Sequence, residues 1–296
     1  MEKWAGLFLV AVSATGFGLM SSFARLASKL NVNLFTLLSF RFLLAFLILL
    51  AICIFTKKSF HLACKKIIII SLLGILGYAV MAYLLFSSYN YMPASIATII
   101  FYAYPLLTYV ISIISRHEDF KLSKAGILLI CLFGLFISIY SGGEIEIIGL
   151  VFAFGAGLIY SLFIFISDTF IKDIPSVVSS TMICLTSGLT LLFIGISRHQ
   201  VSPHVSMEGW AIITALSIAS TVIPIVFFFN GVKLIGATNS AIVSIIEPIT
   251  SMLFSMLFFH DVLNRMQMTG IVIVLVATIS SQLNFDKRSM LNNFSN

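Results

Sequence analysis

Ten long apolar runs constrain the fold of this chain more than any other feature. Each holds about 20 mostly apolar residues, the length that an α-helix needs to cross a bilayer. Of the 296 residues, 60% are hydrophobic and only 9% are charged, whereas a water-soluble domain carries about a quarter charged residues. Because the runs lack β alternation and are too long for barrel strands, the predicted fold class is an all-α integral membrane protein. The predicted transmembrane helices are residues 4–25, 33–55, 67–90, 93–115, 124–141, 147–168, 176–197, 209–231, 236–259 and 267–284.

The second half of the chain also repeats the first at one constant shift in numbering, the repeat offset. This offset places residues 93–105 on residues 236–248, and it pairs His117 with His260. Each half contains five predicted spans, an odd number, so the second half enters the membrane in the opposite orientation to the first. The predicted domains are a first five-helix repeat (1–142), a second, inverted five-helix repeat (143–285) and a cytoplasmic C-terminal tail (286–296).

The distribution of charge predicts how the chain faces the membrane. With the N-terminus inside, the cytoplasmic segments hold 12 Lys and Arg residues and the opposite side holds 4. Both termini are therefore expected in the cytoplasm. The formal net charge of +6 is spread over short loops, where the expected partner is the lipid bilayer and not nucleic acid. The four cysteines have no metal-ligand spacing, so neither a metal nor a cofactor is predicted.

Short motifs mark both halves of the chain. They are Gly6, Gly16 and Gly18 in the first run, Arg41-Phe42 in the second, Pro93-Ala94 through Tyr104-Pro105 to Glu118, Gly236-Ala237 through Glu247-Pro248 to Asp261, and Gly126 or Gly270 early in the next run. With these motifs, over roughly residues 4–284, the chain resembles the EamA-type permeases of the drug/metabolite transporter (DMT) superfamily. It departs from their pattern at Asp261, where members of the family commonly carry Glu.

This resemblance implies a fold and a function. It implies a central cavity lined by helices 1, 3, 4, 6, 8 and 9, and transport of amino acids, nucleosides, sugars, sulfur metabolites or toxic compounds, often outward. We therefore expect a permease of the bacterial inner (plasma) membrane that exports a small-molecule substrate, such as an amino acid, by alternating access. A pair of five-helix repeats can enclose its own cavity, so a monomer is expected.

Glu247 is the sharpest candidate for a substrate-binding residue. It lies about eleven residues into its span, where a carboxylate costs several kcal/mol unless it is paired or protonated. Pro248 lacks a backbone N–H and favours a local kink. Glu247 could bind a substrate amine, carry a coupled proton, or act as a structural acid at the kink. Its repeat counterpart is Tyr104, so the two halves are chemically unequal.

Arg41 is the charged residue inside the second span. It could bind an anionic substrate group or neutralise Glu247. The favoured interpretation is structural: Arg41 snorkels outward or ties its helix to a neighbour.

Further candidates come from helices expected to border the cavity. Aromatic walls with a few amides suit a small zwitterion or a planar metabolite, and the alternatives are helix packing and the interfacial aromatic belt. These substrate-binding candidates are Tyr78, Tyr83, Tyr102, Tyr160, Asn230 and Asn239. Pro105, Pro248, Glu118 and Asp261 are assigned gating or structural roles. For the two acids the favoured role is capping or pairing with the following loop, which contributes roughly 0–1 kcal/mol.

Other function classes have weaker support. All five histidines lie in loops or at span ends, and the sequence has no HExxH, phosphate-loop or nucleophile motif, so an enzyme is not expected. The loops are too short to form the filter of a channel. A passive facilitator of the same fold is the main alternative, and a sensory or structural membrane protein is the next.

Overall fold

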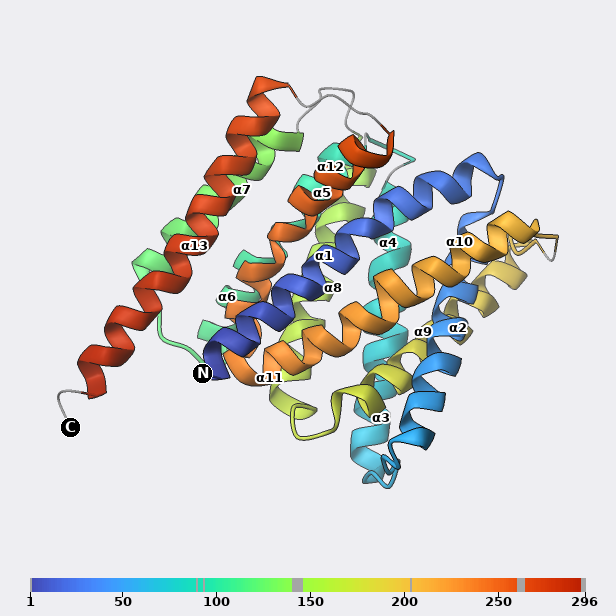
Figure 1. Ribbon diagram of the computed structural model, residues 1–296, viewed down its shortest axis with the longest axis horizontal. Coiled ribbons are helices and arrows are strands. Elements are labelled where there is room, and N and C mark those ends of the chain that lie inside the picture. The colour runs from blue at the N-terminus through green and yellow to red at the C-terminus, as the bar shows by residue number, and fades with distance from the viewer. Residues whose placement is uncertain are drawn as a thin grey trace.

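A computed structural model shows a bundle of helices (Figure 1). The structure describes residues 2–88, 90–92, 94–139, 146–202, 204–259 and 264–293. Within these ranges every regular element is helical, as the apolar runs predict, and there is no strand. The elements are α1 (Glu2–Lys29), α2 (Leu34–Phe55), α3 (Cys64–Leu72), η1 (Leu73–Ala79), α4 (Val80–Ser88), α5 (Ala94–Phe101), α6 (Tyr104–Ile114), α7 (Leu122–Ile139), α8 (Ile147–Phe170), α9 (Ser176–Ser197), α10 (Met207–Ser217), η2 (Ile218–Val222), α11 (Ile223–Ser244), α12 (Ile246–Phe259) and α13 (Arg265–Asn293).

Seven helical segments are long and apolar enough to cross a membrane, and three shorter apolar helices accompany them. This confirms the prediction of a multi-pass helical membrane protein. The seven are Glu2–Lys29, Leu34–Phe55, Cys64–Ser88, Ile96–Ile114, Ile147–Phe170, Ser176–Ser197 and Met207–Ser244, and the shorter ones are Leu122–Ile137, Ile246–Phe258 and Arg265–Ser280.

The connection predicted before residue 236 coincides with a kink in the structure. Two helical stretches within Met207–Ser244 meet at Gly236, whose backbone angles are not helical. Gly236 has a φ of 78°, a left-handed conformation that glycine adopts without steric cost. The chain therefore bends at Gly236 where the sequence suggested a connection between two spans. The count of ten spans stays a prediction.

Helices of the two halves pack against one another. α1 lies against α11 and α12, and α8 lies against η1, α4, α5 and α6. At the repeat offset these two sets of contacts are equivalent: α1 corresponds to α8, α11 corresponds to α4 and α5 together, and α12 corresponds to α6. α2 packs on its counterpart α9, and α7 packs on its counterpart α13 at one edge of the bundle (Figure 1).

Two helices contain a π-helical segment at equivalent places. One is η1, between α3 and α4, and the other is η2, between α10 and α11. The repeat offset places η1 on residues 216–222, which include η2. A π-helical segment widens the turn and is frequent at functional sites.

Two further helices are interrupted at equivalent places. α5 ends at Phe101 and α6 begins at Tyr104, while α11 ends at Ser244 and α12 begins at Ile246. A proline follows each gap, and it leaves the carbonyl four residues earlier without its helical N–H donor. These carbonyls belong to Phe101, upstream of Pro105, and to Ser244, upstream of Pro248.

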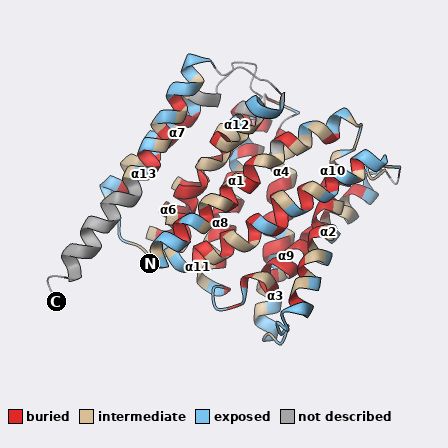
Figure 2. Ribbon diagram, in the orientation of Figure 1, coloured by how far each residue is buried: buried red, intermediate tan, exposed pale blue. Residues whose placement is uncertain are grey.

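Burial separates the inner helix faces from the outer ones (Figure 2). Buried residues line the faces along which the helices meet, and large apolar side chains are exposed around the outside. Phe8, Phe133 and Phe193, for example, are each more than half exposed. A soluble protein would hide such side chains, whereas a bilayer solvates them as well as a protein core does.

Candidate functional site

Arg41, four tyrosines and Glu247 come together at the helix interruptions. Tyr78 lies in η1, Tyr102 lies in the gap between α5 and α6, and Glu247 lies in the first turn of α12. Glu247 interacts electrostatically with Arg41 and with these two tyrosines. Broken helices that meet inside a membrane bundle are typical of transporter binding sites.

Arg41 points into the bundle and is only 1% exposed. Its Nε donates to Thr221 Oγ1 over 2.6 Å and its Nη2 donates to the Ser220 carbonyl over 3.1 Å. Its Nη1 lies 3.0 Å from Met20 Sδ, and the Tyr78 hydroxyl is a further hydrogen-bonding neighbour. Arg41 therefore ties α2 to η2, as one of the sequence interpretations had it. It does not snorkel outward, because its acceptors lie on the inner face of η2.

The guanidinium of Arg41 lacks a directly paired carboxylate. In the part of the chain that the structure describes, Lys66 pairs with Asp173 and Lys124 pairs with Glu118, and Arg41 belongs to neither ion pair. The contacts of Arg41, to hydroxyl, carbonyl and thioether groups, are all neutral and leave its positive charge uncompensated by contact. A buried charge in this condition favours a mobile anionic group as its partner.

Glu247 supplies a carboxyl group close by. It stands in the first turn of α12, where the positive end of the helix dipole favours a carboxylate by about 0.3–1 kcal/mol. The Tyr102 hydroxyl is its side-chain hydrogen-bond donor. Pro248 follows Glu247 in the sequence, and α11 ends at Ser244, three residues before Glu247. The helix is therefore interrupted where the sequence predicted a kink.

An aromatic wall lies beside the two charged side chains. The Tyr160 ring is 4.8 Å from that of Tyr104 and stacks on Phe101 at 5.6 Å and on Phe163 at 5.8 Å. Phe163 also contacts the edge of Tyr78 at 5.4 Å. Aromatic faces attract cations, so the wall and Glu247 together suit an ammonium group.

Tyr104, the repeat counterpart of Glu247, is fully buried at the first residue of α6. Its hydroxyl faces Ser244 but meets no partner in hydrogen-bond geometry among the described residues. A buried hydroxyl without a partner costs free energy, and it is available to a ligand. The candidate site is closed to solvent in this structure. Its four tyrosines are each at most 6% exposed, and they are Tyr78, Tyr102, Tyr104 and Tyr160.

Glycines let neighbouring long helices approach both interruptions. A Cβ on Gly157 of α8 would lie 2.9 Å from the Phe101 carbonyl oxygen, and a Cβ on Gly18 of α1 would lie 2.7 Å from the Glu247 carbonyl oxygen. Small residues at helix interfaces allow this close approach in membrane bundles. The two breaks are therefore supported by direct backbone packing.

The other predicted site residues lie elsewhere. Tyr83 lies near Phe35 and under the guanidinium of Arg198, 5.2 Å from its ring centroid. Asn230 accepts a hydrogen bond from Ser176 Oγ over 2.7 Å. Pro105 and Pro248 lie at the starts of α6 and α12. The substrate-binding roles of Tyr83 and Asn230 stay predictions.

Glu118 and Asn239 line a second, polar cavity of about 180 Å³. Glu118 forms an ion pair with Lys124 of α7 and not with the loop that was expected, and its gating or structural role stays a prediction. Asn239 Nδ2 donates to the Ile235 carbonyl over 2.8 Å. Asp261, the counterpart of Glu118, lies outside the described residues. The remaining lining residues are Ser112, His117, Phe165, Asp168, Ile235, Gly236, Ala237 and Thr238.

Asp168 in this cavity is a residue that sequence reasoning missed. Its Oδ2 accepts a hydrogen bond from the Ala237 N–H over 3.2 Å. Gly236 turns the backbone immediately before Ala237, so Asp168 caps the helical segment that leads to Glu247. The only signal in the sequence was a lone acid near the end of a long apolar run.

No metal centre is suggested by the described residues. Within them no three His, Cys, Asp or Glu side chains are grouped as metal ligands. Cys53, Cys131 and Cys184 are buried thiols and Cys64 is exposed. Cys184 stands close to the Arg41 guanidinium and is its repeat counterpart. Thr221, which accepts a hydrogen bond from Arg41, is in turn the repeat counterpart of Tyr78.

Comparison with known families agrees with this architecture. The EamA-like transporter family matches residues 4–140 and, a second time, residues 147–281. The chain belongs to the EamA-like transporter family. It is therefore a multi-pass membrane protein of a transporter family, as the motifs around Arg41 and Glu247 predict.

Similar proteins carry transporter names without a substrate. The uncharacterized transporter YcbK of Bacillus subtilis (strain 168) is 23% identical over 198 residues, which cover 62% of this chain and 62% of YcbK. The uncharacterized transporter sll1319 of Synechocystis sp. (strain ATCC 27184 / PCC 6803 / Kazusa) is 26% identical over 214 residues, 70% of this chain and 63% of that protein. The matched part thus spans less than two thirds of either relative. A crystal structure with a TM-score of 0.78 covers 95% of this chain and 97% of its own at 17% identity, which establishes a common fold alone.

Proposed function

We propose that this EamA-like protein exports small zwitterionic metabolites, amino acids or related compounds, across the bacterial inner membrane by alternating access. In this proposal two inverted five-helix repeats, residues 1–142 and 143–285, form ten spans around one site. The termini and the tail (286–296) are cytoplasmic, and the working unit is a monomer.

A single observation carries the choice of substrate. Arg41 is buried without a contacting carboxylate, while Glu247 lies near it with a tyrosine hydroxyl as its donor. Opposite charges that share a low-dielectric site but do not touch leave room for a ligand that carries both signs. The substrate carboxylate would bind Arg41, and the substrate ammonium would bind Glu247 and the face of Tyr160.

The packing of the two halves supports alternating access. α1 and α8 make equivalent contacts with the interrupted helices of the opposite half. Because π-helical turns and proline gaps carry fewer regular hydrogen bonds, they are the places where a helix bends with least cost. Rocking about these four points would open the closed site to one side at a time.

Glu247 also offers a route to proton coupling. A protonated carboxyl group in a site of this kind can release its proton when the ammonium group of a substrate binds there. Outward movement of the substrate would then be linked to inward movement of a proton. A passive facilitator of the same fold is the alternative, and it would show substrate exchange without any response to a pH gradient.

The test is transport by purified protein in proteoliposomes. The probes are a neutral amino acid, the amine that lacks its carboxylate, and the acid that lacks its amine. Substrate exchange is expected for the amino acid, with the two truncated compounds competing roughly ten- to hundredfold more weakly, the factor that loss of one charged hydrogen bond implies. Equal competition by all three compounds would contradict the zwitterion proposal.

Variants then separate the two charged contacts. Glu247→Gln is expected to lower the apparent affinity for the amino acid and for the amine, but to spare that for the acid. Arg41→Gln is expected to do the reverse. Tyr91→Phe is the matched control, because Tyr91 lies between α4 and α5 against Phe152 and is not a candidate site residue, while Tyr102→Phe removes the donor to Glu247. If Tyr91→Phe and Tyr102→Phe alter transport equally, the site has been misplaced.

A further inference from the structure

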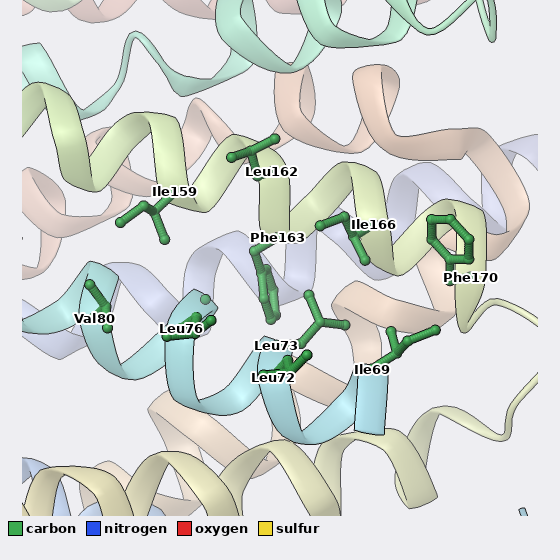
Figure 3. A pocket seen from close by; sticks show the side chains of 11 residues that line it. Ile69, Leu72, Leu73, Leu76, Val80, Ile159, Leu162, Phe163, Ile166 and Phe170 are labelled. Atoms are coloured by element: carbon green, nitrogen blue, oxygen red, sulfur yellow. The ribbon is translucent and has the colours of Figure 1, made fainter. Parts of the chain in front are cut away.

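An apolar groove of about 520 Å³ runs between α8 and the helix formed by α3, η1 and α4 (Figure 3). Side chains from both helices face one another across it, and Phe163 reaches between them (Figure 3). The volume falls in the range of about 300–1,000 Å³ that small-molecule sites occupy. The lining residues are Ile69, Leu72, Leu73, Leu76, Gly77, Val80, Ile159, Leu162, Phe163, Ile166 and Phe170.

The groove exists because α8 diverges from α3. α8 packs on η1 and α4, whereas α3 packs on α9. In the other half the equivalent space is filled, because α1 packs on both α10 and η2. A Cβ on Gly16 would lie 2.8 Å from the Ala219 carbonyl oxygen, so α1 closes directly on η2. The counterpart of Gly16 is Ile159, whose branched side chain lines the groove.

The open side of the groove faces the lipid. Leu72, Leu76 and Leu162 line it and are 46%, 58% and 40% exposed. A cavity with an apolar lining stays free of water and takes up hydrocarbon instead. The chemistry of the lining therefore fits an acyl chain and excludes a polar ligand along this length.

One end of the groove is basic. Lys66 Nζ donates to the carbonyl of Phe170, a lining residue, over 2.6 Å and to Asp173 Oδ1 over 2.7 Å. Lys65 and Lys172 are exposed next to these two helix ends. Three lysines and one aspartate leave this end positively charged. On the proposed orientation it lies at the cytoplasmic leaflet, where anionic lipids are concentrated.

The deep end of the groove touches the candidate site. Phe163 lines the groove and contacts both Tyr160 and Tyr78, with ring centroids 5.8 Å and 5.4 Å apart. Gly77 makes room for that ring, because a Cβ there would lie 2.9 Å from Phe163 Cδ2. Whatever fills the groove therefore supports the aromatic wall from behind.

We propose that the groove binds one acyl chain of an anionic phospholipid, with its phosphate at Lys65, Lys66 and Lys172. The chain extends along α8 to Phe163 and holds that ring against Tyr78 and Tyr160. The assignment rests on the proposed orientation in the membrane, but it requires no transport of any substrate.

Quenching of tryptophan by brominated lipids tests the proposal directly. The background carries Trp4→Phe and Trp210→Phe, and Leu76→Trp places the reporter in the groove. Leu129→Trp is the matched control, because Leu129 is 56% exposed on α7 and lies outside the groove. Brominated phosphatidylglycerol is expected to quench the Leu76→Trp reporter at a lower fraction of total lipid than brominated phosphatidylcholine, and to show no such preference at the Leu129→Trp reporter.

Charge variants then test the basic end. Lys65→Gln and Lys172→Gln leave the contacts of Lys66 intact, and each is expected to reduce the preference for phosphatidylglycerol roughly fivefold. Leu162→Trp, on the opposite wall of the groove, replaces Leu76→Trp if that variant does not fold. Equal quenching by the two lipids at the groove reporter would overturn the proposal, because ordinary boundary lipid would then fill the groove. Displacement of the brominated lipid by an apolar solute, with no effect of the lysine variants, would also overturn it.

Discussion

Gly157 and Gly155 lie two residues apart on α8, and the same substitution is expected to act on them in opposite directions. A Cβ on Gly157 would lie 2.9 Å from the Phe101 carbonyl oxygen, whereas a Cβ on Gly155 would meet only Leu84 Cδ1 at 3.6 Å. The first distance is shorter than carbon–oxygen contacts of about 3.3–3.6 Å. The obstacle is backbone, which cannot rotate away as a side chain would.

The expected magnitude is the difference in stability between the Gly157→Ala and Gly155→Ala variants. Gly→Ala inside a helix is worth about 0.5–1 kcal/mol at either position, so this contribution cancels between the two variants. Overpacking at residue 157 costs about 1–3 kcal/mol. Gly157→Ala is therefore expected to be about 1–3 kcal/mol less stable than Gly155→Ala. For a protein of this size that corresponds to a melting temperature about 2–6 °C lower.

The assay is thermal unfolding of the purified variants in one detergent, followed by the reaction of their buried thiols with a fluorogenic maleimide. Gly155→Ala should match or exceed the wild type, and Gly157→Ala should fall below it. Transport by Gly157→Ala should fall as well, since α8 would be pushed away from the break before Tyr104. Equal melting temperatures for the two variants would refute the claim that α8 packs directly on that break.

Three further outcomes are expected. Asp168→Ala removes the acceptor of the Ala237 N–H, so it should cost about 0.5–2 kcal/mol and speed hydrogen exchange over residues 237–244; unchanged exchange would rule out the cap. With the other three cysteines replaced, Cys184 should react with a small methanethiosulfonate slowly at rest and faster during substrate exchange, and a constant rate would mean that the site does not open there. The hydrogen bond from Lys66 lowers the pKa of Asp173, so this contact contributes stability above the ordinary pKa of aspartate and loses it as the pH falls through the lowered value. Melting temperatures of the wild type and Asp173→Asn should accordingly converge as the pH falls from about 4 through the lowered pKa of Asp173, and a constant difference would contradict the ion pair.

The class of fold could be predicted from the sequence because lipid imposes one simple rule along the chain. Long apolar runs must become helices, and this held for all of the described regions. The interruptions at residues 102–103 and 245 were harder to place, since both lie inside continuous apolar runs. Proline at 105 and 248 indicated a kink, but the π-helical turns of η1 and η2 carry no comparable residue signature.

The candidate site could be predicted in part. Glu247 was identifiable because an acid inside an apolar run is costly, and Tyr78, Tyr102 and Tyr160 followed from the helices on which they lie. The acceptors of Arg41 on η2 belong to the other half of the chain, so hydropathy could not reveal them. The apolar groove was also hidden, because it depends on α3 packing on α9 while α8 packs on η1 and α4, which the sequence pattern does not show.

The pairing of Arg41 with Cys184 has a consequence for how such a chain can arise by duplication. These two residues are counterparts, and they meet where α2 crosses α9. Two identical halves would have placed a second guanidinium there, and two like charges at close range in a low-dielectric interior repel strongly. In an ancestor with two identical halves, an arginine at this position in both copies would have kept α2 and α9 from packing closely. Positions at which counterparts meet are thus the ones where fused copies must first become different, and here that difference leaves a single guanidinium between α2 and α9.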